Sequence, residues 1–399
     1  MTQQTAAVFP AERRCPFEPP REHAELREQH GIFEVDLPSG QQAWLISGHA
    51  DVRKALEDDR LSADLARPNF PSLRAQAVDS PLKGTFMRSD GEAHLRIRRM
   101  LNREFTVRRA ESMRPMIEEV VDSALAALAA AGPGADLVEL YALPVPSGLI
   151  CRLLGVPYEQ HKLFEERTST MINTRSAPEA VRGAAMELYS YLVELVALRR
   201  REPQDDLITR LLKEQVEPGH LQEAELASIS MLLLAGAHET TASMIAAGVL
   251  TLLQHPDQLA LLRQRPELMP GAVEELLRYL TVAQVGTFRV AAADLRVGDR
   301  EIRAGEGVIL DLAGADWDPS MFEEPDRLDI TRNARRHVAF SHGPHNCVGQ
   351  SLARVELTLA YQRLLDRFPD LALAVDPAEL RYRPHTVGLA GVERLPVTW

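Results

Sequence analysis

The spacing of hydrophobic and polar positions divides the chain into a large helical part and smaller β-rich parts. Two β-rich runs flank a Pro-Ser-Gly turn in residues 31–48, which predicts a hairpin. The period is mostly helical over about 49–280 and again over 349–367. Short strands with glycine turns are expected in 281–312, and 371–399 forms a β-rich tail. The pattern predicts a mainly α protein with a smaller β region, of the α+β class.

Two of the helical segments are especially clear. Residues 112–132, SMRPMIEEVVDSALAALAAAG, predict an amphipathic helix that ends at a glycine. Residues 223–254 form one long helical pattern that is apolar on nearly all sides, as a core helix is. At 1.5 Å per residue this helix would span about 45 Å, enough to cross a domain. No clean boundary interrupts the chain, so residues 1–399 are expected to form a single two-lobed domain.

Composition narrows the classes of protein that this chain can be. The net charge of −12 argues against nucleic acid as the main partner, because phosphate contacts need a basic surface. The N-terminus has no continuous apolar stretch, and no apolar run reaches the roughly 18 residues of a membrane span. The three cysteines, Cys15, Cys151 and Cys347, are far apart, which disfavours a disulfide scaffold. We therefore expect a soluble protein of the reducing cytoplasm, with no membrane association.

One of these cysteines stands in an unusual setting, the decapeptide FSHGPHNCVG. Cys347 comes directly before a helical pattern, and the unpaired N–H groups of a helix N-terminus stabilise a thiolate. Gly343 permits a tight turn before the sulfur, and Gly349 lets a flat group approach the backbone. Phe340 is placed to shield the sulfur from water. The spaced set, with His345, indicates a thiolate site more than an ordinary buried cysteine.

This decapeptide resembles the haem-binding signature of the cytochrome P-450 family, F-x-x-G-x-[H/R]-x-C-x-G. The resemblance implies the cytochrome P-450 fold, in which a long central helix covers the haem and the cysteine loop lies on the other side. It makes Cys347 the ligand of iron in haem b (iron protoporphyrin IX), where the thiolate favours O–O cleavage. It also assigns His345 to a haem propionate and Phe340 to the ring near the sulfur. The resemblance covers nearly the whole chain and rests on four separated motifs.

A second motif, AGAHETTA, lies inside the long apolar helix. Thr240 can donate a hydrogen bond to the carbonyl of Gly236 four residues earlier and bend the helix, which opens a groove for O2. Glu239 and Thr240 resemble the acid–alcohol pair with which the family delivers protons during O2 activation. In the family pattern a second glycine stands where this chain has Ala237. The extra methyl is expected to narrow the oxygen pocket and leave the catalytic pair intact.

The segment EELLRYL contains Glu275 and Arg278 on one helix face. It resembles the E-x-x-R motif of the family, whose third partner is an arginine in a P-E-R-F-like segment. Here that segment is PDRLD, which assigns Arg327, with Asp326 and Leu328 departing from the pattern. The three charged side chains are expected to lock the irregular segment before the cysteine loop.

Two further segments carry expected propionate ligands. His94 and Arg98 lie one helical turn apart in SDGEAHLRIRRMLNREFT. The resemblance assigns both to a haem propionate, and it assigns Arg289, in GTFRVA, to the same task. Together with His345 they would give four hydrogen-bonding groups for two carboxylates.

The resemblance also suggests where substrate binds and where electrons enter. It places the pocket at mostly apolar residues, Leu232, Ala235, Ala283, Val285 and Val387. Mostly apolar contacts predict a hydrophobic, fairly large substrate that is hydroxylated or epoxidised. The subgroup resembled often acts on polyketides, terpenoids, steroids or other secondary metabolites. The chain carries no flavin or iron–sulfur motif, so a ferredoxin and its reductase are the expected electron donors to an expected monomer. Arginines that the resemblance places on the cysteine side predict a basic docking patch, namely Arg99, Arg103, Arg108, Arg109, Arg335, Arg336 and Arg354.

Other interpretations stay open at this point. The chain could bind haem as a sensor without oxygenating, although the Glu239–Thr240 pair argues against that. Cys347, His342 and His345 could hold zinc, but no second cysteine lies nearby and structural zinc takes four ligands. Within the enzyme class, dealkylation and oxidative coupling are alternatives to hydroxylation.

Overall fold

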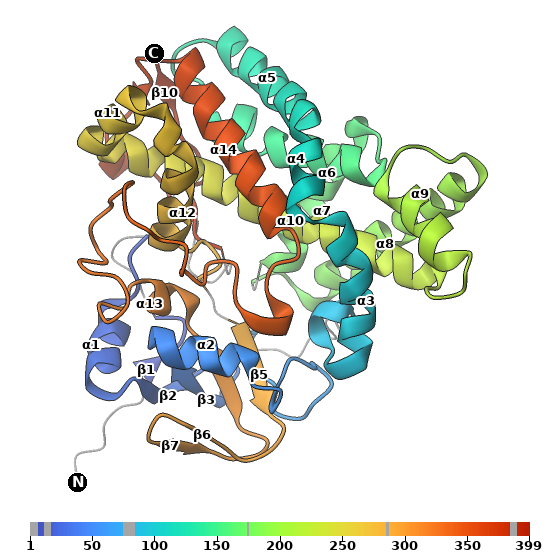
Figure 1. Ribbon diagram of the computed structural model, residues 1–399, viewed down its shortest axis with the longest axis vertical. Coiled ribbons are helices and arrows are strands. Elements are labelled where there is room, and N and C mark those ends of the chain that lie inside the picture. The colour runs from blue at the N-terminus through green and yellow to red at the C-terminus, as the bar shows by residue number, and fades with distance from the viewer. Residues whose placement is uncertain (1–6, 12–16, 75–83, 174, 285–286, 384–388) are drawn as a thin grey trace. The chain divides into compact units, whose positions relative to one another are not determined.

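The computed structural model describes residues 7–11, 17–74, 84–173, 175–284, 287–383 and 389–399 (Figure 1). Cys15, Val285 and Val387 lie outside these residues. The chain divides into two compact units, each made from separate stretches of sequence. The first, called the sheet unit, comprises Met1–Ile97, His255–Val348 and Tyr382–Gly391. The second, called the helical unit, comprises Arg98–Gln254, Gly349–Arg381 and Val392–Trp399.

Most of the described chain is helical, which confirms the predicted mainly α class with a smaller β region. The helical unit contains α4 (Val107–Ser112), α5 (Arg114–Ala131), α6 (Pro144–Leu154), α7 (His161–Ile172), α8 (Pro178–Arg201), α9 (Leu207–Leu211), α10 (Glu223–Gln254) and α14 (Gln350–Arg367). The sheet unit contains α1 (Arg21–His30), α2 (His49–Glu57), α11 (Pro256–Gln264), α12 (Met269–Leu280) and α13 (Leu312–Asp316). Helix α3 (Gly91–Glu104) begins in the sheet unit and ends in the helical unit.

Short single turns complete the helical structure. They are η1 (Phe86–Arg88), η2 (Val138–Ala142), η3 (Tyr158–Gln160), η4 (Leu212–Val216), η5 (Pro266–Leu268), η6 (Gly343–His345) and η7 (Pro377–Glu379). Among the described residues, no helix combines the length and the apolarity that crossing a membrane requires.

The sheet unit is built on a six-stranded sheet in the order β1-β2-β3-β8-β5-β4. Its strands are β1 (Ala7–Val8), β2 (Ile32–Asp36), β3 (Gln42–Ile46), β4 (Leu61–Ser62), β5 (Thr287–Ala291) and β8 (Gly307–Leu310). β2 and β3 form the predicted hairpin, with Ile32 opposite Ile46. β3 pairs in parallel with β8, which joins the N-terminal hairpin to the late β region.

Two small pairs complete the β structure. β6 (Leu295–Val297) and β7 (Arg300–Ile302) form a hairpin of the sheet unit, and β9 (Ala372–Leu373) pairs with β10 (Val397–Thr398) in the helical unit. The predicted strands after residue 281 are confirmed, and the helix α13 follows the last of them.

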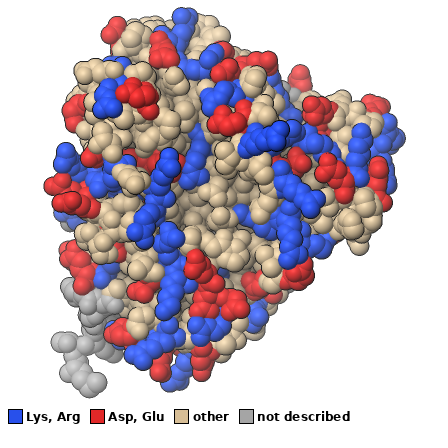
Figure 2. Space-filling view, in the orientation of Figure 1, with Lys and Arg blue, Asp and Glu red and all other residues tan. Residues whose placement is uncertain are grey.

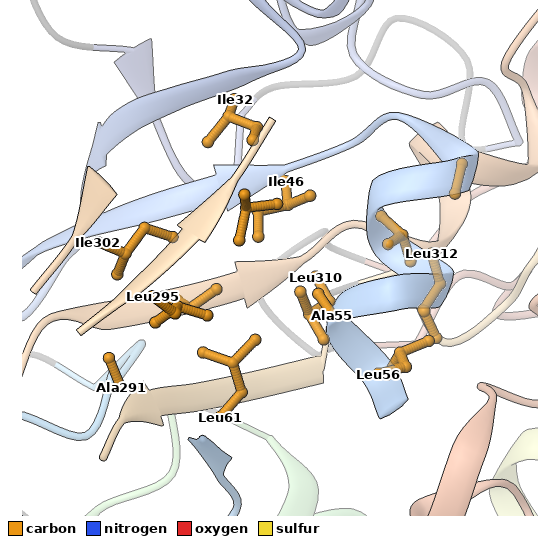
Figure 3. Packing of buried hydrophobic residues seen from close by; sticks show 14 of the residues in the cluster. Ile32, Ile46, Ala55, Leu56, Leu61, Ala291, Leu295, Ile302, Leu310 and Leu312 are labelled. Carbon is orange, nitrogen blue, oxygen red and sulfur yellow. The ribbon is translucent and has the colours of Figure 1, made fainter. Parts of the chain in front are cut away.

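Helix α2 covers one face of this sheet (Figure 3). Val52, Ala55 and Leu56 recur at helical spacing, so they share one face, and they are buried with sheet residues such as Ile46 and Leu310. Burial of the larger of these side chains, Val52 and Leu56, stabilises the fold by about 1.5–3 kcal/mol each. This packing fixes the end of α2, which lies against Gly343 of the cysteine loop.

The central helix of the helical unit has the predicted bounds, Glu223–Gln254. It packs closely on α14, because a Cβ at Gly248 would lie 2.1 Å from the hydroxyl oxygen of Tyr361. That hydroxyl donates to the carbonyl oxygen of Met244. The Tyr141 hydroxyl donates to the carbonyl oxygen of Ala360 at 2.6 Å, which ties α14 to η2.

The amphipathic helix predicted for 112–132 is α5, which begins two residues later. Pro115 stands in its first turn, where its fixed φ and missing N–H are tolerated. Gly132, with a φ of 79°, ends the helix as predicted.

Candidate functional site

The residues proposed for the site divide between the two units. The sheet unit holds the cysteine loop, His94, Arg289 and the E-x-x-R pair. The helical unit holds Arg98, Gly349 and the acid–alcohol helix α10.

The cysteine loop is folded tightly on itself. Gly343 has a φ of 68°, and a Cβ there would lie 2.6 Å from the carbonyl oxygen of Leu56 at the end of α2. Glycine is therefore required at this turn, as predicted. The Cys347 N–H donates to the carbonyl oxygen of Phe340 at 2.8 Å, and the Cys347 side chain is exposed. The loop thus presents the thiol at the surface of the unit.

Two features near this thiol agree with the sequence analysis, namely the helix that follows it and the free space at Gly349, while the shielding of the sulfur by Phe340 stays a prediction. Helix α14 begins at Gln350, three residues after Cys347. An added Cβ at Gly349 would meet no atom within 4 Å, which leaves room for a flat group. The ring of Phe340 lies 5.9 Å from the ring of His337, between their centroids.

His94 connects α3 to this loop. Its Nδ1 lies 2.7 Å from the carbonyl oxygen of Phe86, and its Nε2 lies 3.0 Å from the carbonyl oxygen of Pro344. Its ring centroid is 3.9 Å from that of His345. The structure therefore brings the two predicted histidines together. Arg98, one helical turn further along α3, is buried.

Arg289 lies on β5 and is 4% exposed. Its Nη1 donates to the carbonyl oxygen of its neighbour Phe288 at 2.8 Å. A second guanidinium acts on it, that of Arg88, which the sequence analysis did not single out. Burial lowers the pKa of each of the two side chains to about 10, and the charge of Arg88 further lowers that of Arg289, opposed by Asp90.

These two cations test whether the site fits a haem. The Nε of Arg88 is buried with no hydrogen-bond partner, and neither guanidinium forms an ion pair within the described part of the chain. Both stay charged at neutral pH, so they fit an anionic group that binds there. The two carboxylates of a porphyrin are such groups, and the exposed thiol of Cys347 is a soft iron ligand. The residues present therefore fit haem.

The E-x-x-R pair is fully buried. Arg278 donates from Nε to Glu275 Oε2 at 2.7 Å and from Nη2 to Oε1 at 2.8 Å, and both side chains are 0% exposed. The remaining donor, Nη1, reaches the carbonyl oxygens of Asp316 and Pro325, each at 2.9 Å. Arg278 thus fastens α12 to the irregular segment before the cysteine loop.

The prediction that Arg327 is the third partner is wrong. Its Nη1 donates to Glu324 at 3.0 Å, and its side chain is 63% exposed. The third partner is Arg332, whose Nε donates to Glu275 Oε1 at 3.1 Å. Arg332 also donates to the carbonyl oxygens of Glu323 and Glu324. The segment turns back on itself between the two arginines, so the arginine of ITR, rather than that of PDR, reaches the carboxylate.

In the helical unit, the acid–alcohol motif marks the one opening along a buried helix. Every residue of α10 between Ile229 and Leu252 is buried except Ala235, Gly236, Ala237 and Thr240. The Thr240 hydroxyl donates to the carbonyl oxygen of Gly236 at 2.8 Å, as predicted. The helix continues through this hydrogen bond, and the bend remains a prediction.

The neighbours of this opening are polar as well as apolar. Glu239 is 4% exposed, and the predicted pocket residue Leu232 is 8% exposed. His238 is buried, with Nε2 3.7 Å from Glu165 Oε1 on α7, a pair that the sequence analysis did not single out. The Ser147 hydroxyl donates to the same carboxylate at 2.7 Å. Ala283, the pocket residue described in the sheet unit, is half-buried.

Comparisons with known proteins decide the family. The family model described as Cytochrome P450 matches residues 159–265 and 261–377. The chain is 46% identical to vitamin D3 dihydroxylase of Streptomyces griseolus, over 100% of this chain and 98% of that protein. This chain belongs to the cytochrome P450 family. Pentalenic acid synthase of Streptomyces avermitilis is 44% identical, over 98% of this chain and 97% of that protein.

Solved P450 structures agree in fold. The crystal structure of CYP105P1 in complex with filipin I has a TM-score of 0.93 and 40% identity, and covers 99% of each chain. The mycinamicin VIII C21 methyl hydroxylase of Micromonospora griseorubida, bound to mycinamicin VIII, has a TM-score of 0.93 and 39% identity over 98% of this chain and 100% of that one. As a P450, the chain is an oxidoreductase with a haem–thiolate iron that uses O2, a substrate and a redox partner.

Proposed function

We propose that this P450 is a monooxygenase that takes two electrons from a ferredoxin and hydroxylates or epoxidises a hydrophobic secondary metabolite. The observation that carries the proposal is the cysteine loop, which presents an exposed Cys347 thiol within the same unit as the buried Arg289 and the half-buried Arg88. The cofactor is haem b, which when bound supplies O2 activation and oxidation of a C–H or C=C bond.

The residues of the sheet unit hold the cofactor. The Cys347 thiolate ligates the iron, and Phe340 shields the sulfur from water. Gly343 sets the turn that aims the thiol, because no larger residue fits against Leu56. Arg289 and His345, with His94 and with Arg98 of the helical unit, bind the propionates.

Residues of α10 move protons. The hydrogen bond from Thr240 to the carbonyl of Gly236 leaves the hydroxyl oxygen able to accept another hydrogen bond. That hydroxyl can also rotate and donate elsewhere, so it can pass a proton. Glu239, next in sequence and buried, is the acid that resupplies it. The opening at Ala235, Gly236 and Ala237 gives a small ligand access to this pair.

The substrate class is proposed from the pocket and from the relatives. Leu232, Ala235 and Ala283 are apolar, which favours a hydrophobic molecule. Relatives include a pentalenic acid synthase and a hydroxylase that acts on a methyl group of mycinamicin VIII. The substrate that we propose is a terpenoid, a polyketide or a steroid.

We also propose that ferredoxin docks on the predicted arginines. Arg99, Arg103 and Arg108, on α3 and α4, are exposed, while Arg109 and Arg354 are half-buried. Figure 2 shows Lys and Arg side chains gathered over α3 and α4. A local basic surface on a chain with a net charge of −12 favours an acidic partner. Arg335 and Arg336 of the sheet unit are exposed as well.

The absorption spectrum of the reduced protein with carbon monoxide tests the proposal. A strongly red-shifted Soret band is expected, because the Cys347 thiolate would ligate the iron of the reduced protein. The matched variant C347H is expected to bind haem and lose that red shift. If the wild type takes up no haem when haem is supplied, or if C347H keeps the red-shifted band, the proposed role of Cys347 is wrong. Among the described residues, no cluster of three or more His, Cys, Asp or Glu side chains offers a metal site instead.

A further inference from the structure

Arg88 forms no ion pair with an acidic side chain among the described residues. It ends the turn η1, where its N–H donates to the carbonyl oxygen of Thr85 at 2.9 Å. Its guanidinium lies over the ring of Phe70, 5.6 Å from the ring centroid. Its Nε is buried and lacks a hydrogen-bond partner among the described residues. An aromatic face attracts a cation but does not neutralise it.

A neighbouring acid does not fill this role. Asp90, the carboxylate that acts on Arg289, accepts hydrogen bonds from the Ser62 hydroxyl and from the Ala63 N–H at 2.9 Å. It forms no ion pair with Arg88 or Arg289 within the described part of the chain. Arginine cannot become neutral on burial, whereas a lysine can lose its proton and a carboxylate can gain one. Asp90 instead ties the segment of Arg88 to β4, where Ser62 lies opposite Val290, the neighbour of Arg289 on β5. The two guanidiniums therefore belong to the same part of the sheet unit, and the charge of Arg88 acts against that of Arg289.

The turn η1, which carries Arg88, is connected to the cysteine loop through His94. The carbonyl oxygen of Phe86, in the same turn as Arg88, lies 2.7 Å from His94 Nδ1. The other ring nitrogen of His94 lies 3.0 Å from the carbonyl oxygen of Pro344, three residues before Cys347. All these residues belong to the sheet unit, so the same compact unit carries the guanidiniums and the thiol.

We infer that Arg88 and Arg289 form one two-guanidinium site for a single carboxylate, and that this carboxylate is a propionate of the haem. Arg88 is then a positioning residue for the cofactor, additional to Arg289. The inference rests on the proposed haem binding. The chemistry recognised is a planar carboxylate that two forked donors can share. A carboxylate of the substrate is the other source of the same chemistry, and the experiment separates the two.

The first measurement is the rate at which ferric haem leaves the holoenzyme for an excess of a haem-scavenging apoprotein, without substrate. Loss of a charged hydrogen bond is worth about 1.5–3 kcal/mol, so R88Q should release haem about 10 to 100 times faster. R88K keeps the charge without the fork and should release it only a few times faster. R60Q removes an exposed arginine and is the matched control, with an expected rate equal to wild type.

The second measurement uses haem dimethyl ester, whose propionates carry no charge. With this cofactor R88Q and wild type should release haem at the same rate, because the group that Arg88 binds is missing. Unloaded R88Q should also be at least as stable as unloaded wild type in urea, since an unanswered cation is removed.

These results separate two kinds of failure. If wild type retains no haem, the proposed function fails. If wild type retains haem and R88Q releases it at the wild-type rate, the inference alone is overturned and a substrate carboxylate becomes the ligand. Equal acceleration by R88Q with haem and with its dimethyl ester would also overturn it, because the effect would then be structural.

Discussion

The sheet unit holds two groups of arginine side chains, buried or half-buried, that differ in what neutralises them. Arg278 is 0% exposed, and its donors are taken by Glu275 and by two main-chain carbonyls. Arg88 and Arg289 are neutralised by no side chain among the described residues. Burying either group of charges costs free energy, but only in the first group are the charges paired within the protein in the absence of a ligand. Buried arginines with an internal acid therefore indicate a structural lock, and those without one indicate a binding site.

The largest expected effect comes from breaking the complete group. E275Q leaves Arg278 and Arg332 without their shared carboxylate, and it should lower the free energy of unfolding by about 3–5 kcal/mol. Urea unfolding of the haem-loaded protein measures this. E275D keeps the charge and should lose less, which separates charge from shape. Wild-type stability in E275Q would contradict the structural role of the group.

A buried acid extends this comparison, because a carboxylate, unlike an arginine, can become neutral by binding a proton. Glu356 on α14 is 4% exposed, its Oε1 has no hydrogen-bond partner among the described residues, and burial raises its pKa from 4.5 to about 8. The folded state therefore keeps a proton that the unfolded state loses above pH 4.5. The stability that this group contributes is complete below pH 4.5 and disappears as the pH rises through 8.

E356Q should remove this dependence. Between pH 5 and pH 8 the wild type should lose about 2–4 kcal/mol more stability than E356Q. Urea unfolding of both proteins at several pH values measures the difference. Parallel pH profiles would show that Glu356 is charged in the folded protein.

A smaller effect distinguishes the third partner from the arginine that the sequence suggested. R332Q removes a charged hydrogen bond to Glu275 and should lower the free energy of unfolding by about 2 kcal/mol. R327Q should leave stability unchanged, because Arg327 is exposed and, among the described residues, pairs only with Glu324. If R332Q and R327Q lost the same free energy of unfolding, Arg327 would also have to be a partner of Glu275.

The smallest expected effect concerns arginines at the protein surface and their contribution to ferredoxin binding. The double reversal R103E and R109E should raise the ferredoxin concentration for half-maximal turnover about tenfold at low salt, because steering by the basic surface is lost. The folded stability and the CO-bound spectrum should stay as in wild type. R201E, an exposed reversal on α8, is the control. Unchanged ferredoxin dependence in the double variant would rule out this surface.

The sequence was a good guide wherever a contact is local or a motif is compact. The hairpin of β2 and β3, the bounds of α10 and the bond from Thr240 to Gly236 follow from periodicity and from a spacing of four residues. The glycine requirement at Gly343 followed from its place in the motif, although its cause, the carbonyl of Leu56, is far away in sequence.

What the sequence did not reveal depends on distant chain segments. Arg332 and Arg327 differ only in how the segment turns between them, which no periodicity records. In the sequence, nothing distinguishes Arg88 from the other arginines. It is distinguished by its burial and by its charge interaction with Arg289, which lies on a strand two hundred positions later. The predicted pocket residues Val285 and Val387 lie outside the described residues, so their role stays a prediction.

The interleaving of the two units has a consequence for recombination between related genes. The chain passes from one unit to the other after residues 97, 254, 348, 381 and 391. A crossover that exchanged residues 98–254 with a relative would replace Glu239, Thr240 and the proposed propionate ligand Arg98, and it would leave Cys347, Arg88 and Arg289 in place. Most of the residues that hold the cofactor can therefore be inherited separately from those that supply protons in a chimeric enzyme.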